Sequence, residues 1–298
     1  KKWDILISIF RRLGGIAENV CQREGGFGRG IFSVDPSLSS RIYTPSELMI
    51  EKDDFYLDNN KIRIKKEKNY SNEVRDFCNY YQDNFSWGGG GNETTQAFEK
   101  GLNLFPNDLK KLIKDYTLLD IEKSQQGDWD EIILRRFLDQ RKFKFNNNSV
   151  ICPVLELVNH QVNAFPFVRI GNGLSTPNYP PQSSELFFAY GYKSSLRRVF
   201  SYGFFCKESV VFSFPFSIYF EDQDIQFICK GLELNTDKIQ YQFTNSQIIV
   251  DGLPVGSIYR PSFIKSYFDH LLDLTDFKTI PKDVLLKILD FNLVRRKE

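Results

Sequence analysis

The feature that most constrains the fold is a change of hydrophobic period in the middle of the chain. Between about residues 72 and 143, apolar residues recur at helical spacing, as Val74, Phe77 and Tyr81 do. Residues three and four apart share one face of a helix, so this stretch is expected to be helical. On both sides, short apolar runs lie between turn residues, which is typical of strands. The sequence therefore predicts an α+β fold with a mostly β core and a helical insert at 72–143.

Local signals place the other elements. The start of the chain favours an amphipathic helix over a signal peptide, because Asp4 interrupts an apolar stretch that is short and lacks a small-residue cleavage site. The four glycines at 88–91 lack the Gly-Lys-Ser/Thr ending of a phosphate-binding loop and favour a flexible linker. A hairpin turn is expected at 58–60 and helix starts at 106–108 and 128. Strands are expected at 16–20, 31–34, 41–43, 186–190, 210–220, 239–243 and 248–250, and closing helices at 261–272 and 281–289.

Composition excludes several classes of protein. Hydrophobic residues make up 41% of the chain and charged residues 26%, as in an ordinary globular protein. The formal net charge of +1 provides no long-range field for nucleic acid or an anionic membrane. The five cysteines lie far apart and the chain has two histidines, so neither a zinc site nor any other metal is expected. The cysteines are expected to be reduced thiols, which indicates the cytoplasm or another reducing compartment.

A glycine-rich segment at 25–30 is the first of three segments that carry a functional signal. Without side chains, its backbone N–H and C=O groups can approach a ligand closely. A dinucleotide-binding loop would open a helix, whereas this segment runs into the predicted strand at 31–34. The structural alternative is a turn whose backbone angles require glycine.

The other two segments follow the helical stretch. Residues 153–160 form an apolar run that ends in Asn159 and His160. These side chains offer donors and acceptors to an adenosyl ligand, or they are the polar end of a core segment. Residues 185–205 contain Tyr190 at the end of an apolar run and Tyr-Gly-Phe at 202–204. Taken alone, aromatic packing explains this third segment equally well.

In this order the three segments resemble the SET domain of protein methyltransferases, in the branch of the Rubisco large-subunit lysine methyltransferase. That family has a glycine loop, then Pro-x-x-[Asp/Glu]-x-x-Asn-His, here at 153–160, then a strand ending in Tyr and a Tyr-Gly-Phe. The branch also carries a helical insert and a Pro-x-x-Leu segment, similar to that at 45–50. The resemblance covers about residues 14–206. It implies a SET domain of short sheets around a threaded, pseudoknot-like segment.

The resemblance implies S-adenosylmethionine (AdoMet) as the cofactor, S-adenosylhomocysteine as its product, and a lysine on a protein substrate as the acceptor. Tyr202 matches the tyrosine beside the transferring methyl group and is the implied catalytic residue. Glu156 stands where the branch usually has Asp. The implied cofactor-binding residues are Gly26, Phe27, Gly28, Arg29, Arg141, Glu156, Asn159, His160, Tyr190 and Phe204.

The expected domains are a catalytic SET domain at 1–213 and a C-terminal region at 214–298 that is a candidate for substrate binding. This tail mixes strand and helix patterns, whereas the branch's substrate-binding domain is all-helical. Histidine is a second candidate acceptor, because the branch also contains an actin-histidine methyltransferase; the presence of Tyr202 favours lysine. A SET-like interaction module without catalysis is the alternative from another class.

Overall fold

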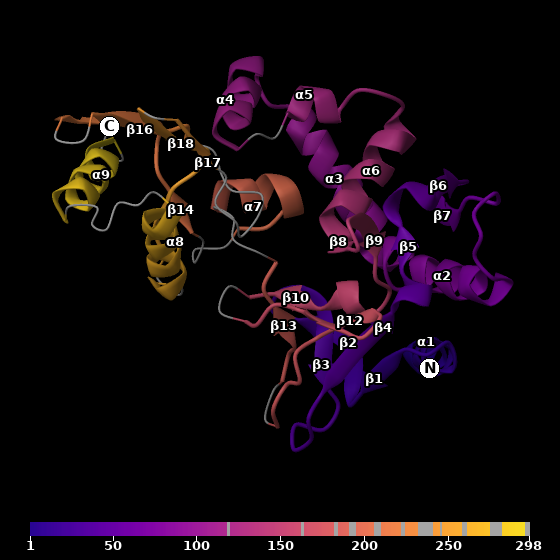
Figure 1. Ribbon diagram of the computed structural model, residues 1–298. Helices are drawn as coiled ribbons and strands as arrows, with labels where there is room; N and C mark the ends of the chain where they lie inside the picture. The colour runs from indigo at the N-terminus through magenta and orange to yellow at the C-terminus, as the bar shows by residue number, and fades with distance from the viewer. Residues whose placement is uncertain are drawn as a thin grey trace. The chain divides into compact units, whose positions relative to one another are not determined.

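The chain forms two compact units in the computed structural model (Figure 1). The first contains Lys1–Phe105 and Ile121–Tyr190, and the second contains Pro106–Asp120 and Gly191–Glu298. The predicted α+β class with short sheets is confirmed, since no described sheet has more than four strands. Within the described residues, no helix is both long and apolar enough to cross a membrane. The described residues are 1–117, 120–161, 164–181, 184–190, 195–205, 210–221, 224–231, 241–244, 246–257, 261–274 and 282–295.

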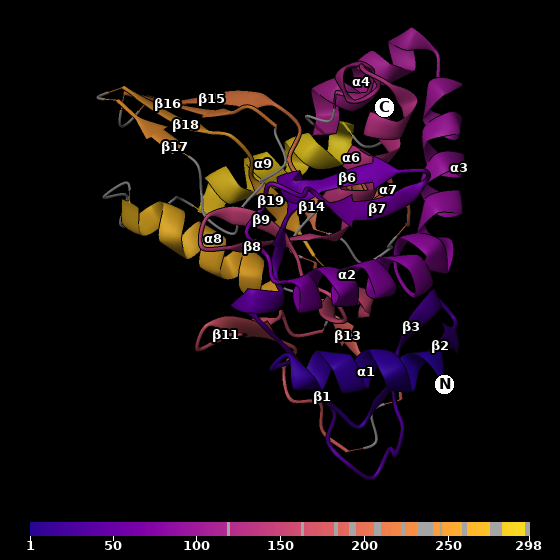
Figure 2. The same cartoon turned by 90° about the vertical axis from the view of Figure 1, so that its right-hand side faces the viewer.

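Helix α1 (Lys2–Arg12) is the amphipathic helix expected at the start of the chain. Its buried face carries Leu6, Ile7 and Phe10. Phe10 follows Leu6 by four residues and Ile7 by three, so all three share one face of the helix. Phe10 stacks on Phe77 of helix α2 (Asn72–Asn84) with ring centroids 5.9 Å apart, and the two helices lie side by side in Figure 2. This contact joins the first helix to the helical insert in one hydrophobic core.

Most of the short sheets in the first unit are antiparallel. Hairpin β6 (Phe55–Asp58) and β7 (Lys61–Ile64) turns at Asn59 and Asn60, whose positive φ angles of 48° and 59° suit asparagine, as predicted. The four-stranded sheet has the order β1 (Ile16–Glu18), β4 (Arg41–Pro45), β12 (Gly173–Ser175) and β11 (Val168–Ile170). The three-stranded sheet has the order β5 (Ile50–Glu51), β9 (Asn148–Ile151) and β8 (Lys142–Phe145).

One hairpin and two long-range pairings position the candidate site. The glycine segment is the tip of hairpin β2 (Val20–Gly25) and β3 (Gly28–Ser33). Strand β10 (Asn159–His160) pairs in parallel with β13 (Phe187–Phe188). The chain just before β13 also bonds to β3, because the N–H of Leu186 donates to the C=O of Ile31 at 2.8 Å. Residues 184–190 therefore lie between the hairpin and the Asn-His segment (Figure 1).

The helical insert is confirmed, and one expectation within it is wrong. Residues 88–91 belong to a kinked turn, Trp87–Gly91, in which Gly89 and Gly90 have non-helical backbone angles, instead of a flexible linker. A Cβ on Gly88 would lie 2.1 Å from the carbonyl oxygen of Asp83, and one on Gly91 would lie 2.5 Å from the Phe137 ring. Close packing thus requires glycine at positions 88 and 91. The insert's other helices in this unit are α3 (Asn92–Asn103), α5 (Ile121–Ser124) and α6 (Trp129–Arg141), the last capped by Asp128 as predicted.

The second unit has a core of its own around a mixed four-stranded sheet. The strands expected at 239–243 and 248–250 are confirmed where they are described, and they pair antiparallel as β17 and β18; residues 239, 240 and 245 lie outside the described residues. The run at 210–220 forms two strands, with Pro215 in the break between them. The sheet order is β15 (Phe216–Phe220), β16 (Ile225–Cys229), β18 (Gln247–Val250) and β17 (Tyr241–Phe243). The remaining elements are α4 (Asn107–Thr117), α7 (Ser195–Tyr202), β14 (Val211–Phe212), β19 (Pro254–Gly256), α8 (Pro261–Leu274) and α9 (Lys282–Arg295).

The break between the compact units falls after Tyr190, with residues 106–120 of the insert assigned to the second unit. The functional boundary expected at 213/214 and the threaded segment stay predictions.

Candidate functional site

The tip of the glycine hairpin leaves its backbone open. Gly25 and Gly28 are paired, and Gly26 and Phe27 lie between them. No atom lies within 4 Å of where a Cβ on Gly26 or Gly28 would be, and Gly28 has a φ of +83° that suits glycine. Phe27 is 72% exposed, and its ring meets the Phe187 ring edge to face at 5.7 Å. The hairpin tip thus offers accessible backbone groups beside an aromatic ring.

Arg29 contributes its backbone to this site, while its side chain holds the hairpin in place. Its Nε pairs with Glu24 Oε1 at 3.0 Å, and its Nη1 donates to the carbonyl oxygen of Gly89 in the helical insert. The Arg29 carbonyl oxygen accepts from Asn159 Nδ2 at 3.2 Å. The guanidinium is therefore engaged with the protein itself.

The amide of Asn159 has one chemically allowed orientation. Its Nδ2 donates to the Arg29 carbonyl oxygen at 3.2 Å and to Glu185 Oε1 at 2.8 Å. A carbonyl oxygen and an ionised carboxylate only accept, so the nitrogen must face both of them. Asn159 Oδ1 then faces the other way, as an acceptor that the site can offer to a ligand.

Glu185 is the site residue that the sequence did not single out. A Cβ on Gly30 would lie 2.5 Å from Glu185 Oε1 and 2.6 Å from Asn159 Nδ2, so glycine at position 30 makes room for this pair. A glutamate at the start of a predicted strand usually faces solvent, which gives no functional signal. The available hint was Gly30, directly before the predicted strand at 31–34, because a glycine in or beside a strand can mark a close approach by another group.

His160 and Tyr190 are held together by the β10–β13 pairing. The backbone N–H of Tyr190 donates to His160 Nδ1 at 3.0 Å. An N–H group can only donate, so Nδ1 is unprotonated and the imidazole proton lies on Nε2. The nearby Phe188 carbonyl, 3.2 Å from Nδ1, already accepts from the N–H of Gln161. The Tyr190 hydroxyl donates to the Val158 carbonyl at 2.9 Å. The ring centroids of His160 and Tyr190 lie 5.0 Å apart.

Glu156 belongs to a buried hydrogen-bond network, and the half-buried Arg141 acts on it through its charge. Glu156 is 6% exposed, and its Oε1 accepts from the Tyr81 hydroxyl at 2.7 Å and from the Ser86 hydroxyl at 2.6 Å. Burial raises the pKa of the Glu156 carboxyl above its ordinary value of 4.5, and the charge of Arg141 opposes that rise. The Arg141 guanidinium lies 4.7 Å over the Phe137 ring. Their cofactor-binding role stays a prediction.

The raised pKa gives a pH-dependent prediction for stability. The folded protein holds the Glu156 proton more tightly than the unfolded chain does, so this group's contribution to stability is complete below pH 4.5 and is lost as pH rises through the native pKa. Glu156→Gln keeps an acceptor oxygen and removes the charge. As pH increases from about 4.5 toward neutrality, we expect the free energy of unfolding of Glu156→Gln to rise relative to that of the wild type. Urea titration measures both free energies. A difference independent of pH would contradict the assignment, and exposed Glu18→Gln is the control.

Tyr202 and Phe204 lie in the second unit. Tyr202 ends helix α7, and Gly203 follows with a φ of +79°, a conformation common after a helix. The rings of Tyr202 and Phe204 stack with centroids 5.9 Å apart. The structure thus brings the hairpin, Asn159, His160 and Tyr190 together within the first unit, and it pairs Tyr202 with Phe204 within the second.

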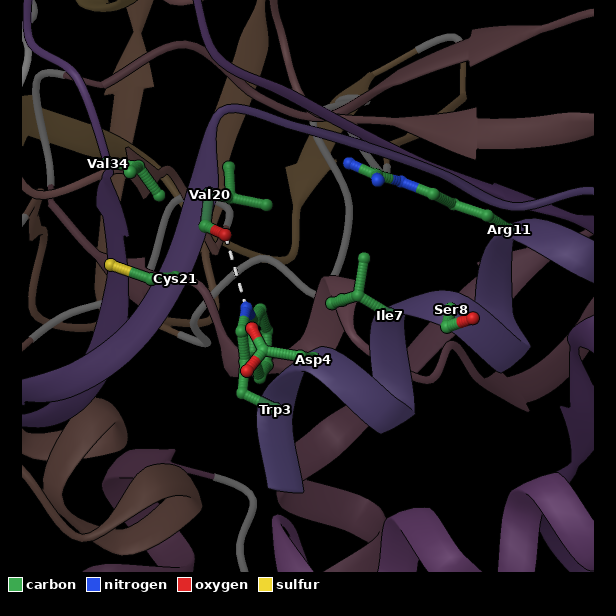
Figure 3. A pocket seen from close by; sticks show the side chains of 8 residues that line it. All are labelled: Trp3, Asp4, Ile7, Ser8, Arg11, Val20, Cys21 and Val34. Atoms are coloured by element: carbon green, nitrogen blue, oxygen red, sulfur yellow. Dashed lines mark hydrogen bonds between the residues drawn. The ribbon is translucent and has the colours of Figure 1, made fainter. Parts of the chain in front are cut away.

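A separate pocket of about 350 Å³ lies between helix α1 and strand β2 (Figure 3). Trp3, Arg11 and Cys21 help to line it, and none of its lining residues is a predicted site residue. The Trp3 Nε1 donates to the Val20 carbonyl at 3.1 Å, and Arg11 donates to the Ala17 carbonyl. These two polar groups of the pocket are thus engaged with the backbone.

The chemistry of the hairpin site suits a polar organic ligand. It combines exposed backbone at Gly26 and Gly28 with the acceptor Oδ1 of Asn159 and the imidazole of His160. The Glu185 carboxylate holds the Asn159 nitrogen beside them. Among the residues that the structure describes, no group of three or more His, Cys, Asp or Glu side chains could hold a metal ion.

Comparisons with known proteins return structural neighbours alone. No protein-family model matches the sequence, and no curated protein matches it. The chain is similar to the SET domain of LSMT bound to lysine and AdoHcy, at 15% identity and a TM-score of 0.43. It is also similar to Rubisco LSMT bound to AdoMet, at 15% and 0.44, and to Rubisco LSMT bound to sinefungin and monomethyllysine, at 16% and 0.44. Each match covers 75% of this chain, which spans 61%, 61% and 60% of those three chains.

Proposed function

We propose that this chain is an AdoMet-dependent protein N-methyltransferase of the SET type, with a lysine side chain as the acceptor. The observation that carries the proposal is the meeting of the glycine hairpin with Asn159 and His160. The Asn159 amide bonds to the hairpin at Arg29, which is 130 positions earlier in the chain. These segments follow one another in the order of the SET motifs, and Tyr190, at the end of the next strand-like run, joins them through His160.

The residues present fit this cofactor. Gly26 and Gly28 leave space at the hairpin backbone, so its N–H and C=O groups can hold an adenosyl or amino-acid moiety. The Asn159 Oδ1 can accept from an ammonium or amine, and the His160 imidazole lies beside it as a further polar group. When bound, AdoMet supplies a methyl group on a positively charged sulfur.

The remaining tasks fall to alignment and the exclusion of water. The lysine amine must be neutral to react, and both burial and a neighbouring positive charge lower the pKa of an amine. Water can then carry the proton away, and no dedicated base is required. In this proposal the Tyr202 hydroxyl orients the amine through a hydrogen bond.

Replacing Asn159 or His160 tests the site directly. We expect Asn159→Ala and His160→Ala each to weaken AdoMet binding by about 1–3 kcal/mol, the cost of one lost buried hydrogen bond. Isothermal titration calorimetry measures the affinity, and circular dichroism checks that the fold survives. The matched control is Asn103→Ala, an exposed asparagine at the end of α3. Wild-type affinity in both variants would refute the assignment.

Labelling identifies the acceptor. Incubation with methyl-labelled AdoMet and host lysate, followed by mass spectrometry, is expected to find the label on a lysine of a single protein. A labelled histidine would favour the second acceptor. AdoMet binding without any transfer would favour the non-catalytic interaction module.

We also propose that the region 214–298 selects the protein substrate. Helix α9 supports this role, because Leu286, Leu289 and Leu293 are 48%, 42% and 56% exposed at helical spacing. Arg295 ends this helix; Arg296, a further candidate contact from the sequence, lies outside the described residues.

A further inference from the structure

Glu185 is held between two glycines of the hairpin. The backbone of Glu185 forms an isolated antiparallel β-bridge with Phe32 of β3. The N–H of the next residue, Leu186, donates to the Ile31 carbonyl at 2.8 Å. Its Oε2 lies 3.1 Å from where a Cβ on Gly25 would be, and its Oε1 lies 2.5 Å from the corresponding position on Gly30. Larger residues at these positions would displace the carboxylate. The hairpin therefore places Glu185 at a defined point beside Asn159.

The contact between Glu185 and Asn159 holds the amide firmly in its orientation. The Nδ2···Oε1 bond is 2.8 Å long and has a charged acceptor, whereas the bond to the Arg29 carbonyl is 3.2 Å long. Hydrogen bonds to a charged group are roughly twice as strong as neutral ones. Without Glu185, only the longer, neutral bond to the Arg29 carbonyl would hold the amide. The firm positioning of Asn159 Oδ1 thus depends on the carboxylate.

We infer that Glu185 is a positioning residue, which acts on the AdoMet site through the amide of Asn159. This inference rests on the proposed function, in which Asn159 Oδ1 binds the cofactor. A positioning role predicts that the effect of removing Glu185 disappears when Asn159 is already absent. A general packing or electrostatic role predicts that the two effects add.

A double-mutant cycle on AdoMet affinity separates these roles. We expect Glu185→Ala to raise the dissociation constant about tenfold in the wild-type background and less than about twofold in the Asn159→Ala background. Glu185→Gln keeps an acceptor oxygen at the same distance, so its affinity is expected to stay within about threefold of wild type. Glu185→Asp withdraws the carboxylate by one methylene. Glu185→Asp is expected to behave like Glu185→Ala. It replaces Glu185→Ala in the double-mutant cycle if the alanine variant does not fold.

Calorimetric titration of the whole chain with AdoMet gives each constant, and Glu18→Ala, an exposed glutamate on β1, is the control. Additive losses in the cycle, or an unchanged affinity in both Glu185→Ala and Glu185→Asp, would overturn the positioning role while leaving the proposed function intact. Absence of AdoMet binding by wild-type protein would overturn the proposed function, and the inference with it.

Discussion

Tyr202→Phe is expected to lower the turnover number on the order of 100-fold, the usual effect of removing one hydrogen bond made mainly in a transition state. The substitution keeps the ring that stacks on Phe204 at 5.9 Å and removes only the hydroxyl. AdoMet affinity is therefore expected to stay within about twofold of wild type. An unequal effect on turnover and binding is the signature of a group that aligns the reacting amine.

The measurement requires the protein substrate found by labelling, with turnover from initial rates and affinity from calorimetry. Tyr56→Phe is the control, because Tyr56 is a half-buried tyrosine of β6, outside the candidate site and outside region 214–298. It is expected to leave both quantities unchanged. Wild-type turnover in Tyr202→Phe would make Tyr202 a packing residue and would remove the only catalytic residue that the motif implies.

The second large effect concerns the kinked turn that replaces the expected linker. Trp87→Ala is expected to lower the free energy of unfolding by about 3–5 kcal/mol, as is usual for a buried aromatic residue. Trp87 is 2% exposed and meets the Phe137 ring edge to face at 5.0 Å. Its Nε1 also donates to the Asn60 carbonyl at 2.9 Å, so the substitution leaves both a cavity and an unsatisfied acceptor.

Urea unfolding followed by circular dichroism measures this loss. Leu104→Ala is the control, because Leu104 is 84% exposed after helix α3, and its loss is expected to stay within about 0.5 kcal/mol. A loss below about 1 kcal/mol for Trp87→Ala would restore the interpretation of residues 88–91 as a linker. The result also bears on the site, because Gly89 in this turn accepts from the Arg29 side chain.

Local chemistry explains what the sequence alone determined. Helices α1, α2 and α6 follow from apolar residues at helical spacing, and the start of α6 follows from Asp128, whose side chain accepts from the Asp130 N–H. The turn at Asn59 and Asn60 follows from the tolerance of asparagine for positive φ. Each of these signals acts within a few residues, so it can be identified without knowledge of distant contacts. The same holds for the motif residues, which were found by type and order.

Only the tertiary structure decided how those residues are used. The resemblance implied a backbone role for Arg29 and a site role for Glu156; the structure engages the Arg29 guanidinium with the insert and buries Glu156 against Tyr81 and Ser86. The nitrogen of Asn159 is engaged by Glu185 and the Arg29 carbonyl, which leaves its Oδ1 as the acceptor. These contacts join residues from 26 to 130 positions apart. Hydrophobic periodicity and turn preference carry no information at that range, since they record only the conformation of neighbouring residues.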